Sequence, residues 1–127
     1  MASVVLDASA VLALLNDEPG AGDVAAALPE AVLSSVNLSE AAAILADIGM
    51  PADDARAVLS GLDIMTVPFD DELAYLAAAL RRATRAAGLS FGDRACLALA
   101  RQRGIAALTA DRAWNKLRLG VEIHLIR

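Results

Sequence analysis

The chain has 127 residues and a net charge of −5 at pH 7. This length predicts one domain with a sizeable core, and the single cysteine, Cys96, excludes an internal disulfide and a cysteine-based zinc site. Although 57% of the residues are hydrophobic, no apolar run approaches the ~18 residues of a membrane-spanning helix. The first residues also lack the basic segment of a signal peptide. We therefore expect a cytoplasmic protein without a signal peptide or membrane anchor.

Short apolar strands alternate with helical segments along the chain. In order, we expect strand 3–6, helices 8–16 and 20–28, strand 31–34, helices 37–48 and 51–61, strand 63–67, helices 70–87 and 90–103, strand 105–109, helix 111–117 and strand 121–126. This alternation is typical of an α/β fold. Right-handed crossovers then give a parallel sheet, of about five strands, with helices on both faces. Leu59 and its apolar neighbours suit the core better than a groove, although both remain open.

Four acidic residues lie at or near the predicted starts of helices. Asp7 and Asp111 each follow a strand, Glu40 lies a few residues after a third strand, and Asp93 comes three positions after Ser90. Residues 37–40 and 90–93 resemble capping boxes or near variants of them. Each acid taken alone is explained by helix capping and by the helix dipole, which favour an acid there by about 0.3–1 kcal/mol.

The four acids are more informative together. Strand-to-helix loops of a parallel sheet emerge at one edge, and carboxylates gathered there repel one another unless protons or cations neutralise them. Because oxygen ligands suit Mg²⁺ or Mn²⁺, the pattern predicts a divalent-cation pocket and metal-assisted cleavage of a phosphodiester. The place of Asp93 in this pocket does not follow from topology, because no strand directly precedes it.

Charge is distributed unevenly between the two parts of the chain. Residues 1–80 contain 13 acidic residues and one basic residue, giving −12, and residues 81–127 contain ten basic and three acidic residues, giving +7. Such asymmetry indicates a polyanionic partner, although ordinary solvated helix faces would explain it as well. Two aromatic side chains, Phe91 and Trp114, are too few to form base-stacking platforms. The candidate phosphate contacts are Arg81, Arg82, Arg85, Arg112 and Lys116.

Four stretches resemble, in order, the motifs of PIN-domain nucleases, and in particular of VapC-type toxins. They are residues 4–10, 34–40, 89–100 and 108–114, and each contains one of the four acids. The likeness extends over residues 1–127 as a single PIN domain. The resemblance implies a parallel sheet with flanking helices and Mg²⁺- or Mn²⁺-dependent endoribonuclease activity on cellular RNA. It also implies that Asp7, Glu40, Asp93 and Asp111 are catalytic and bind the metal.

By the same resemblance, Ser9 and Thr109 are polar supports of the site, and no role is assigned to Asn37 or Ser39. Proteins of this kind usually form homodimers and are held inactive by a small antitoxin protein. Two alternatives remain open. One is an RNA-processing or structure-specific DNA nuclease that is not paired with an antitoxin, and the other is a non-catalytic binding module with the same fold.

Overall fold

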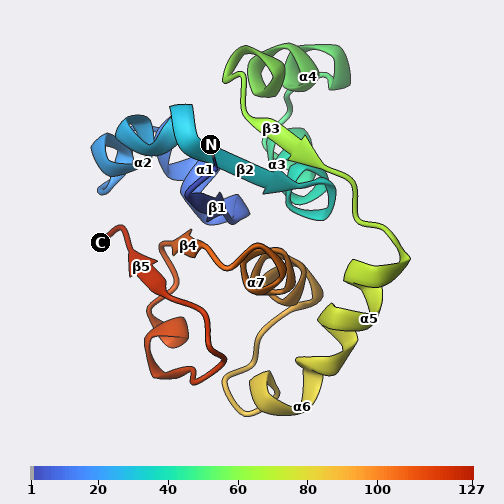
Figure 1. Cartoon of the computed structure of the whole chain (residues 1–127). Helices are drawn as coiled ribbons and strands as arrows, with labels where there is room; N and C mark the ends of the chain where they lie inside the picture. The colour runs from blue at the N-terminus through green and yellow to red at the C-terminus, as the bar shows by residue number, and fades with distance from the viewer. Residues whose placement is uncertain (1) are drawn as a thin grey trace.

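The computed structural model describes residues 2–127 and has a five-stranded parallel sheet at its centre (Figure 1). The order in the sheet is β3-β2-β1-β4-β5, and every neighbouring pair is parallel. The predicted α/β fold with a parallel sheet is therefore confirmed. The strands are β1 (Val4–Leu6), β2 (Ala31–Ser34), β3 (Met65–Val67), β4 (Ala106–Thr109) and β5 (Ile123–Leu125).

Helices cover both faces of the sheet, each face with its own hydrophobic cluster. One face is covered by α1 (Ala8–Leu15), α2 (Ala21–Ala27), α3 (Ser35–Asp47) and α4 (Ala52–Gly61). The other is covered by α5 (Asp71–Ala79) and α7 (Phe91–Arg103), with the short α6 (Arg81–Thr84) between them in the chain. Two 3₁₀ helices are also present, η1 (Leu28–Glu30) and η2 (Arg112–Lys116).

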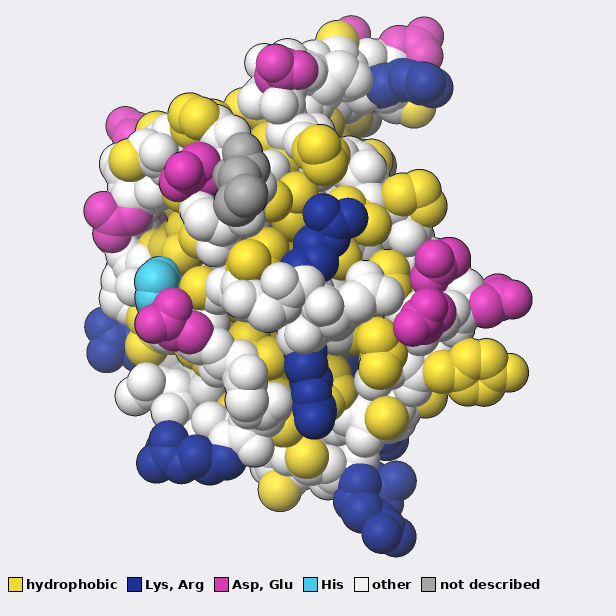
Figure 2. Space-filling model, in the orientation of Figure 1, with side chains coloured by type: hydrophobic (Ala, Val, Ile, Leu, Met, Phe, Trp, Pro, Cys, Tyr) yellow, Lys and Arg dark blue, Asp and Glu magenta, His cyan; other side chains and the backbone are white. Residues whose placement is uncertain are grey.

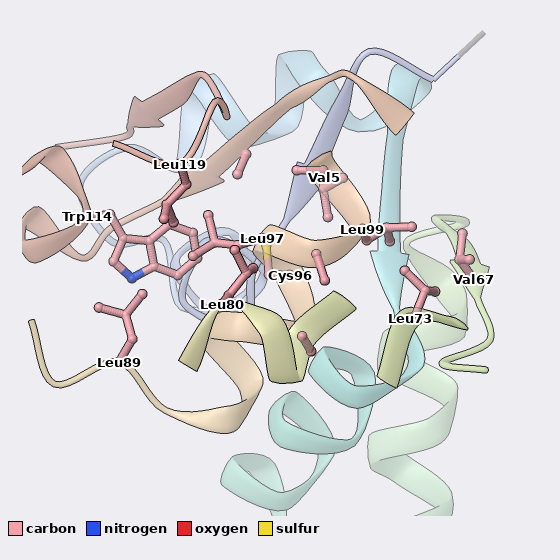
Figure 3. Close-up of a cluster of buried hydrophobic side chains, with 14 of the residues drawn as sticks. Val5, Val67, Leu73, Leu80, Leu89, Cys96, Leu97, Leu99, Trp114 and Leu119 are labelled. Atoms are coloured by element: carbon pink, nitrogen blue, oxygen red, sulfur yellow. The ribbon is translucent and has the colours of Figure 1, made fainter. Parts of the chain in front are cut away.

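The two clusters arise because successive residues of a strand point to opposite faces. In β1, Val5 belongs to the cluster with α5 and α7, and Leu6 belongs to the cluster with α1. The parallel register repeats this alternation in the neighbouring strands, since Val5 is aligned with Val32 and Ala107. Figure 3 shows the first cluster, which also contains the fully buried ring of Trp114 from η2.

The carboxyl end of β1 lies where the order of strands reverses. From β1 the chain runs to β2 and β3 on one side, and it later returns to β4 and β5 on the other. Leu6 is aligned with Leu33 of β2 and Leu108 of β4, so the residues that follow these three strands emerge at one edge. Ligand sites of open α/β sheets lie at such a point, and the predicted acids can therefore meet there.

The prediction of one helix over residues 70–87 is wrong. The N–H of Leu80 donates to the carbonyl oxygen of Ala77 at 3.2 Å, a three-residue spacing that tightens the turn and separates α5 from α6. Leu80 is thereby buried in the core, and the hydroxyl of Thr84 donates to its carbonyl oxygen at 2.8 Å. Neither glycine nor proline lies at this break, so the local sequence does not reveal it.

Several other predicted elements differ in extent or type. The predicted helix 111–117 is the 3₁₀ helix η2, and the predicted strands 63–67 and 121–126 are shortened to β3 and β5. Helix α3 begins at Ser35 rather than at 37, because Ser34 is its N-cap and accepts the N–H of Val36 at 3.2 Å. Leu59 is buried in the core, as favoured above. None of the helices in residues 2–127 has the length and apolar character needed to cross a membrane.

Candidate active site

Asp7 lies at the switch point of the sheet and is only 4% exposed. It is the N-cap of α1, where its Oδ1 accepts the backbone N–H of Ala10 at 2.9 Å. The hydroxyl of Ser9 donates to the same oxygen at 2.7 Å, and the hydroxyl of Thr109 donates to Oδ2 at 2.5 Å. Thr109 ends β4, the strand next to β1, so the parallel pairing of the two strands places it beside Asp7.

Burial dominates the electrostatics of Asp7. Loss of hydration raises the pKa of its carboxyl from 3.8 to about 6, although the hydrogen bonds from Thr109, Ser9 and Ala10 act in the opposite direction. The negative charge of Asp93 raises this pKa further. Asp7 is therefore a fixed, buried carboxylate whose charge is costly in the absence of a cation.

Glu40 is held toward α7 by a buried asparagine. The Nδ2 of Asn37 donates to Glu40 Oε1 at 2.7 Å and to the carbonyl oxygen of Gly92 at 3.0 Å. A Cβ atom at Gly92 would overlap the carboxylate of Glu40, so the glycine leaves the space that Glu40 fills. Sequence reasoning missed both Asn37 and Gly92. The available signal was the three-residue spacing from Asn37 to Glu40, which was interpreted as a helix cap.

Asp93 lies in the first turn of α7 and completes a capping box with Ser90, as predicted. Its Oδ2 accepts the N–H of Ser90 at 2.9 Å, and its own N–H donates to the Ser90 hydroxyl at 3.2 Å. Burial raises the pKa of Glu40, the hydrogen bond from Asn37 lowers it, and the charge of Asp93 raises it again. Asp93 thus acts on both Asp7 and Glu40, which topology alone did not predict.

The field of these acids also reaches the core beneath them. Cys96 on α7 is fully buried, as expected for a small core residue. Burial raises the pKa of its thiol well above the ordinary value, and the charges of Asp7, Asp93 and Glu40 raise it further. We call these three acids the acid cluster, because they share one negative region around the first turns of α7.

Asp111 stands apart from the acid cluster but is joined to it through Thr109. Its carboxylate is exposed and caps η2 by accepting the N–H of Ala113 at 2.9 Å. Its backbone N–H donates to the hydroxyl of Thr109 at 3.0 Å, and that hydroxyl in turn donates to Asp7. The structure therefore places Asp7, Glu40 and Asp93 within electrostatic reach of one another and the fourth acid, Asp111, at the same edge of the sheet.

The donor set suits a hydrated divalent cation. All four acids offer oxygen, and the buried Oδ1 of Asn37 has no hydrogen-bond partner among the described residues. Residues 2–127 contain no group of three or more His, Cys, Asp or Glu side chains close enough to enclose an ion. Mg²⁺ requires no such enclosure, because it usually keeps several waters and takes one or two carboxylates from the protein.

Comparison with known proteins identifies the family. The family model described as PIN domain matches residues 4–119. The chain belongs to the PIN domain family. No curated protein matches the sequence.

Solved structures share the fold of this PIN domain. A toxin–antitoxin complex from Klebsiella pneumoniae is 16% identical, covers 98% of each chain and has a TM-score of 0.77. A DNA-bound VapBC from Salmonella typhimurium is 18% identical with full coverage of both chains and a TM-score of 0.77. VapC20 of Mycobacterium tuberculosis, described as a sarcin–ricin-loop-cleaving toxin, is 20% identical, covers 94% of this chain and 99% of its own, and has a TM-score of 0.72.

The basic residues of the PIN domain fall into two candidate sets. Figure 2 shows most Lys and Arg side chains in the lower half of the view, with acidic side chains mainly in the upper half and at the right edge. Arg81, Arg82 and Arg85 are exposed and line a hollow of about 320 Å³ at the α5–α6 break. Arg112 and Lys116 are exposed on η2, directly after Asp111.

Proposed function

We propose that this PIN domain is a Mg²⁺- or Mn²⁺-dependent endoribonuclease and the toxin of a toxin–antitoxin pair. The observation that carries the proposal is the buried Asp7, which shares one negative region with Glu40 and Asp93 at the switch point of the sheet. Toxin–antitoxin complexes and an RNA-cleaving toxin among the solved structures of the same fold support it.

We assign metal binding to Asp7, Glu40, Asp93 and Asp111. A divalent cation held there would polarise the phosphoryl group and provide an activated water near neutral pH. Ser9 and Thr109 fix the direction of the Asp7 carboxylate by donating to one oxygen each. Asn37 fixes Glu40 in the same manner.

The basic side chains would hold the substrate. Lys and Arg contacts to phosphates position a nucleic acid without reading its sequence. Arg112 directly follows Asp111, and Lys116 lies on the same short helix η2 that Asp111 caps, so these two are the better candidates. A second set of basic residues, Arg81, Arg82 and Arg85, would extend the contact along the RNA. Their position near a helix end offers another explanation, because the helix dipole favours positive charge there.

An antitoxin needs an apolar surface on the toxin, and α3 and α4 provide one. A hollow of about 500 Å³ between them is lined mainly by apolar side chains, with Arg56 at its wall. We propose that an apolar segment of the antitoxin with an acidic residue facing Arg56 fills it. Ala42→Arg should then prevent co-purification with a co-expressed cognate antitoxin. Ala57→Arg is the matched control, because Ala57 is exposed on α4 and does not line the hollow, and this variant should still co-purify with the antitoxin. A homodimer is proposed from the family resemblance alone.

The nuclease assignment is tested with purified protein, Mg²⁺ or Mn²⁺, a looped RNA and a flap DNA. Asp7→Asn and Asp93→Asn should each lose RNA cleavage while remaining folded. Asp70→Asn changes the exposed cap of α5, which is not one of the four acids, and this variant should retain RNA cleavage. Full activity of both site variants would overturn the assignment of the acids. Cleavage of the flap DNA alone would favour a structure-specific DNA nuclease, and cleavage of neither would favour a binding module.

A further inference from the structure

Phe91 is an exposed aromatic side chain at the border of the acid cluster. It is the first residue of α7, two positions before Asp93, and it is 51% exposed. It lines a hollow of about 500 Å³ together with Glu40 and the hydroxyl-bearing Ser35 and Ser39. Glu40 therefore belongs both to the acid cluster and to the wall of this hollow, so the two features adjoin.

The ring of Phe91 is held in place rather than free to swing. Phe69 packs against it edge to face, with 5.4 Å between ring centroids and 85° between planes. The guanidinium of Arg94 lies 5.7 Å from its centroid and is itself anchored by donating to the carbonyl oxygen of Ala77 at 3.1 Å. Trp114, the other large aromatic residue noted in the sequence, is by contrast fully buried. A supported ring that stays half exposed beside a largely apolar hollow, with Glu40 and two hydroxyls at its wall, is suited to contact a ligand.

We propose that Phe91 is a stacking platform that seats one unpaired nucleobase of the RNA strand beside the acid cluster. The inference rests on the proposed ribonuclease function. A strand with a phosphate at the acids must place a neighbouring base on the adjoining surface, and the hollow adjoins through Glu40. A nucleobase presents a flat face to an aromatic ring and polar edges to hydroxyls such as those of Ser35 and Ser39. One platform is too few to bind a strand unaided, but it is enough to orient one base.

The test compares two RNAs of five nucleotides, each with two uridines on either side of a central position. The central position is adenosine in one RNA and an abasic ribose in the other. Adenine stacks better than uracil, so the central adenine is the base expected to occupy the platform. Binding is measured with Mn²⁺ in an Asp7→Asn background, so that the RNA survives. The adenosine RNA should bind more tightly than the abasic RNA by about 5- to 150-fold, the range typical of one base–aromatic stack.

The variants are Phe91→Leu, Phe91→Met and Phe91→Trp, with Tyr75→Leu as the matched control. Tyr75 is 79% exposed on α5 and does not line the hollow. The adenosine advantage should fall to about onefold with leucine or methionine, which keep apolar bulk but lack a flat π face. It should persist with tryptophan and in the control. Thermal melting verifies the fold, and the methionine variant serves if leucine is not tolerated.

Four results would overturn the inference. An adenosine advantage that survives in both Phe91→Leu and Phe91→Met would mean that the base stacks elsewhere. Equal binding of the two RNAs by a parent protein that cleaves RNA would reject the platform and leave the ribonuclease proposal intact. A parent protein that neither binds nor cleaves RNA would reject both. If Phe91→Leu changes only the oligomeric state or the retention of the antitoxin, the ring is a protein contact and the inference fails.

Discussion

Replacing Asp7 by asparagine should stabilise the metal-free protein by an amount that grows with pH. Burial raises the pKa of Asp7 in the folded protein to about 6, from 3.8. The folded state therefore holds this proton more tightly than the unfolded chain does. Stability is greatest while the carboxyl is protonated, and it is lost as pH rises through the window between these two values. Asparagine has the same shape and no charge, so the variant does not incur this loss.

The size of the effect follows from the shift. About two pKa units correspond to about 3 kcal/mol of unfolding free energy, at ~1.4 kcal/mol per unit. By the same linkage the loss is about 1 kcal/mol at pH 4.5 and about 3 kcal/mol at pH 8. The amide oxygen of asparagine can still accept from Ala10 and Ser9, which both donate to Oδ1. Its NH₂ would face Thr109, whose hydroxyl can rotate to accept this NH₂ and to donate its own proton to the Ser9 hydroxyl, 3.4 Å away.

The assay is urea unfolding in EDTA at several pH values between 4.5 and 8. The measured quantity is the difference in unfolding free energy between the variant and the parent, in which the titration of other groups largely cancels. Asp70→Asn is the matched control, because Asp70 caps α5 in the same way but is exposed. A difference that stays constant over this pH range would refute the reasoning, and so would a parent protein that is more stable than the variant at pH 8.

Three further predictions concern the glycine, the metal and the basic residues. Gly92→Ala should push the Glu40 carboxylate away from Asn37 and reduce cleavage about 10- to 100-fold, with little loss of stability because the group that moves is the end of a side chain. Gly22→Ala, at the equivalent second position of α2 with open space around it, should leave cleavage unchanged. Wild-type activity of Gly92→Ala would contradict this prediction. Mn²⁺ at 100 times its Kd should stabilise the folded parent protein by about 2.7 kcal/mol, measured by thermal melting. Glu40→Gln and Asp111→Asn should each reduce this stabilisation. A parent protein whose melting temperature does not change with Mn²⁺ would count against a metal site. Removing the charges of Arg112 and Lys116 should flatten the slope of log K for RNA binding against log salt by roughly 0.7 per lost phosphate contact, measured with single-stranded RNA in the Asp7→Asn background. The same salt titration decides whether Arg81, Arg82 and Arg85 contribute. Unchanged slopes in both sets of variants would mean that the RNA lies elsewhere.

The parts of the site that follow a strand were predictable from sequence. An acid that lies between a strand and a helix can be placed from the local sequence. The end of the strand puts the acid at the carboxyl edge of the sheet, and the start of the helix makes it the N-cap. Asp7 illustrates this, since its cap and the hydroxyl of Ser9 are local contacts. Thr109 is distant in sequence, but its position follows from the pairing of β1 with β4.

The parts that depend on helix packing were not predictable. Asp93 follows a helix rather than a strand, and it reaches the other acids only because α7 packs against α3 at Gly92, where the Asn37 side chain bridges the two helices. The Asn37–Glu40 spacing has two structural meanings. It is a capping box if the helix begins at Asn37, and a side-chain bridge within the helix if it begins earlier. Ser34 is the actual N-cap, so the helix begins before Asn37 and the spacing is a side-chain hydrogen bond within the helix.

The arrangement of charge around the acid cluster supports the proposal of a cation site there. The hydrogen bonds to Asp7 come from neutral hydroxyl and amide donors, which fix its direction and leave its charge in place. Arg94 is the basic residue next to Asp93 in sequence, but it donates to Ala77 and lies over Phe91 instead. Within residues 2–127, the salt bridges are formed by Glu122 with His124 and by Glu18 with Arg127, and none involves the four acids. A chain with ten basic residues in its second part thus leaves the cluster without a protein counter-charge. An ion from solution can supply that charge, and its binding would then recover free energy that the metal-free fold loses at Asp7.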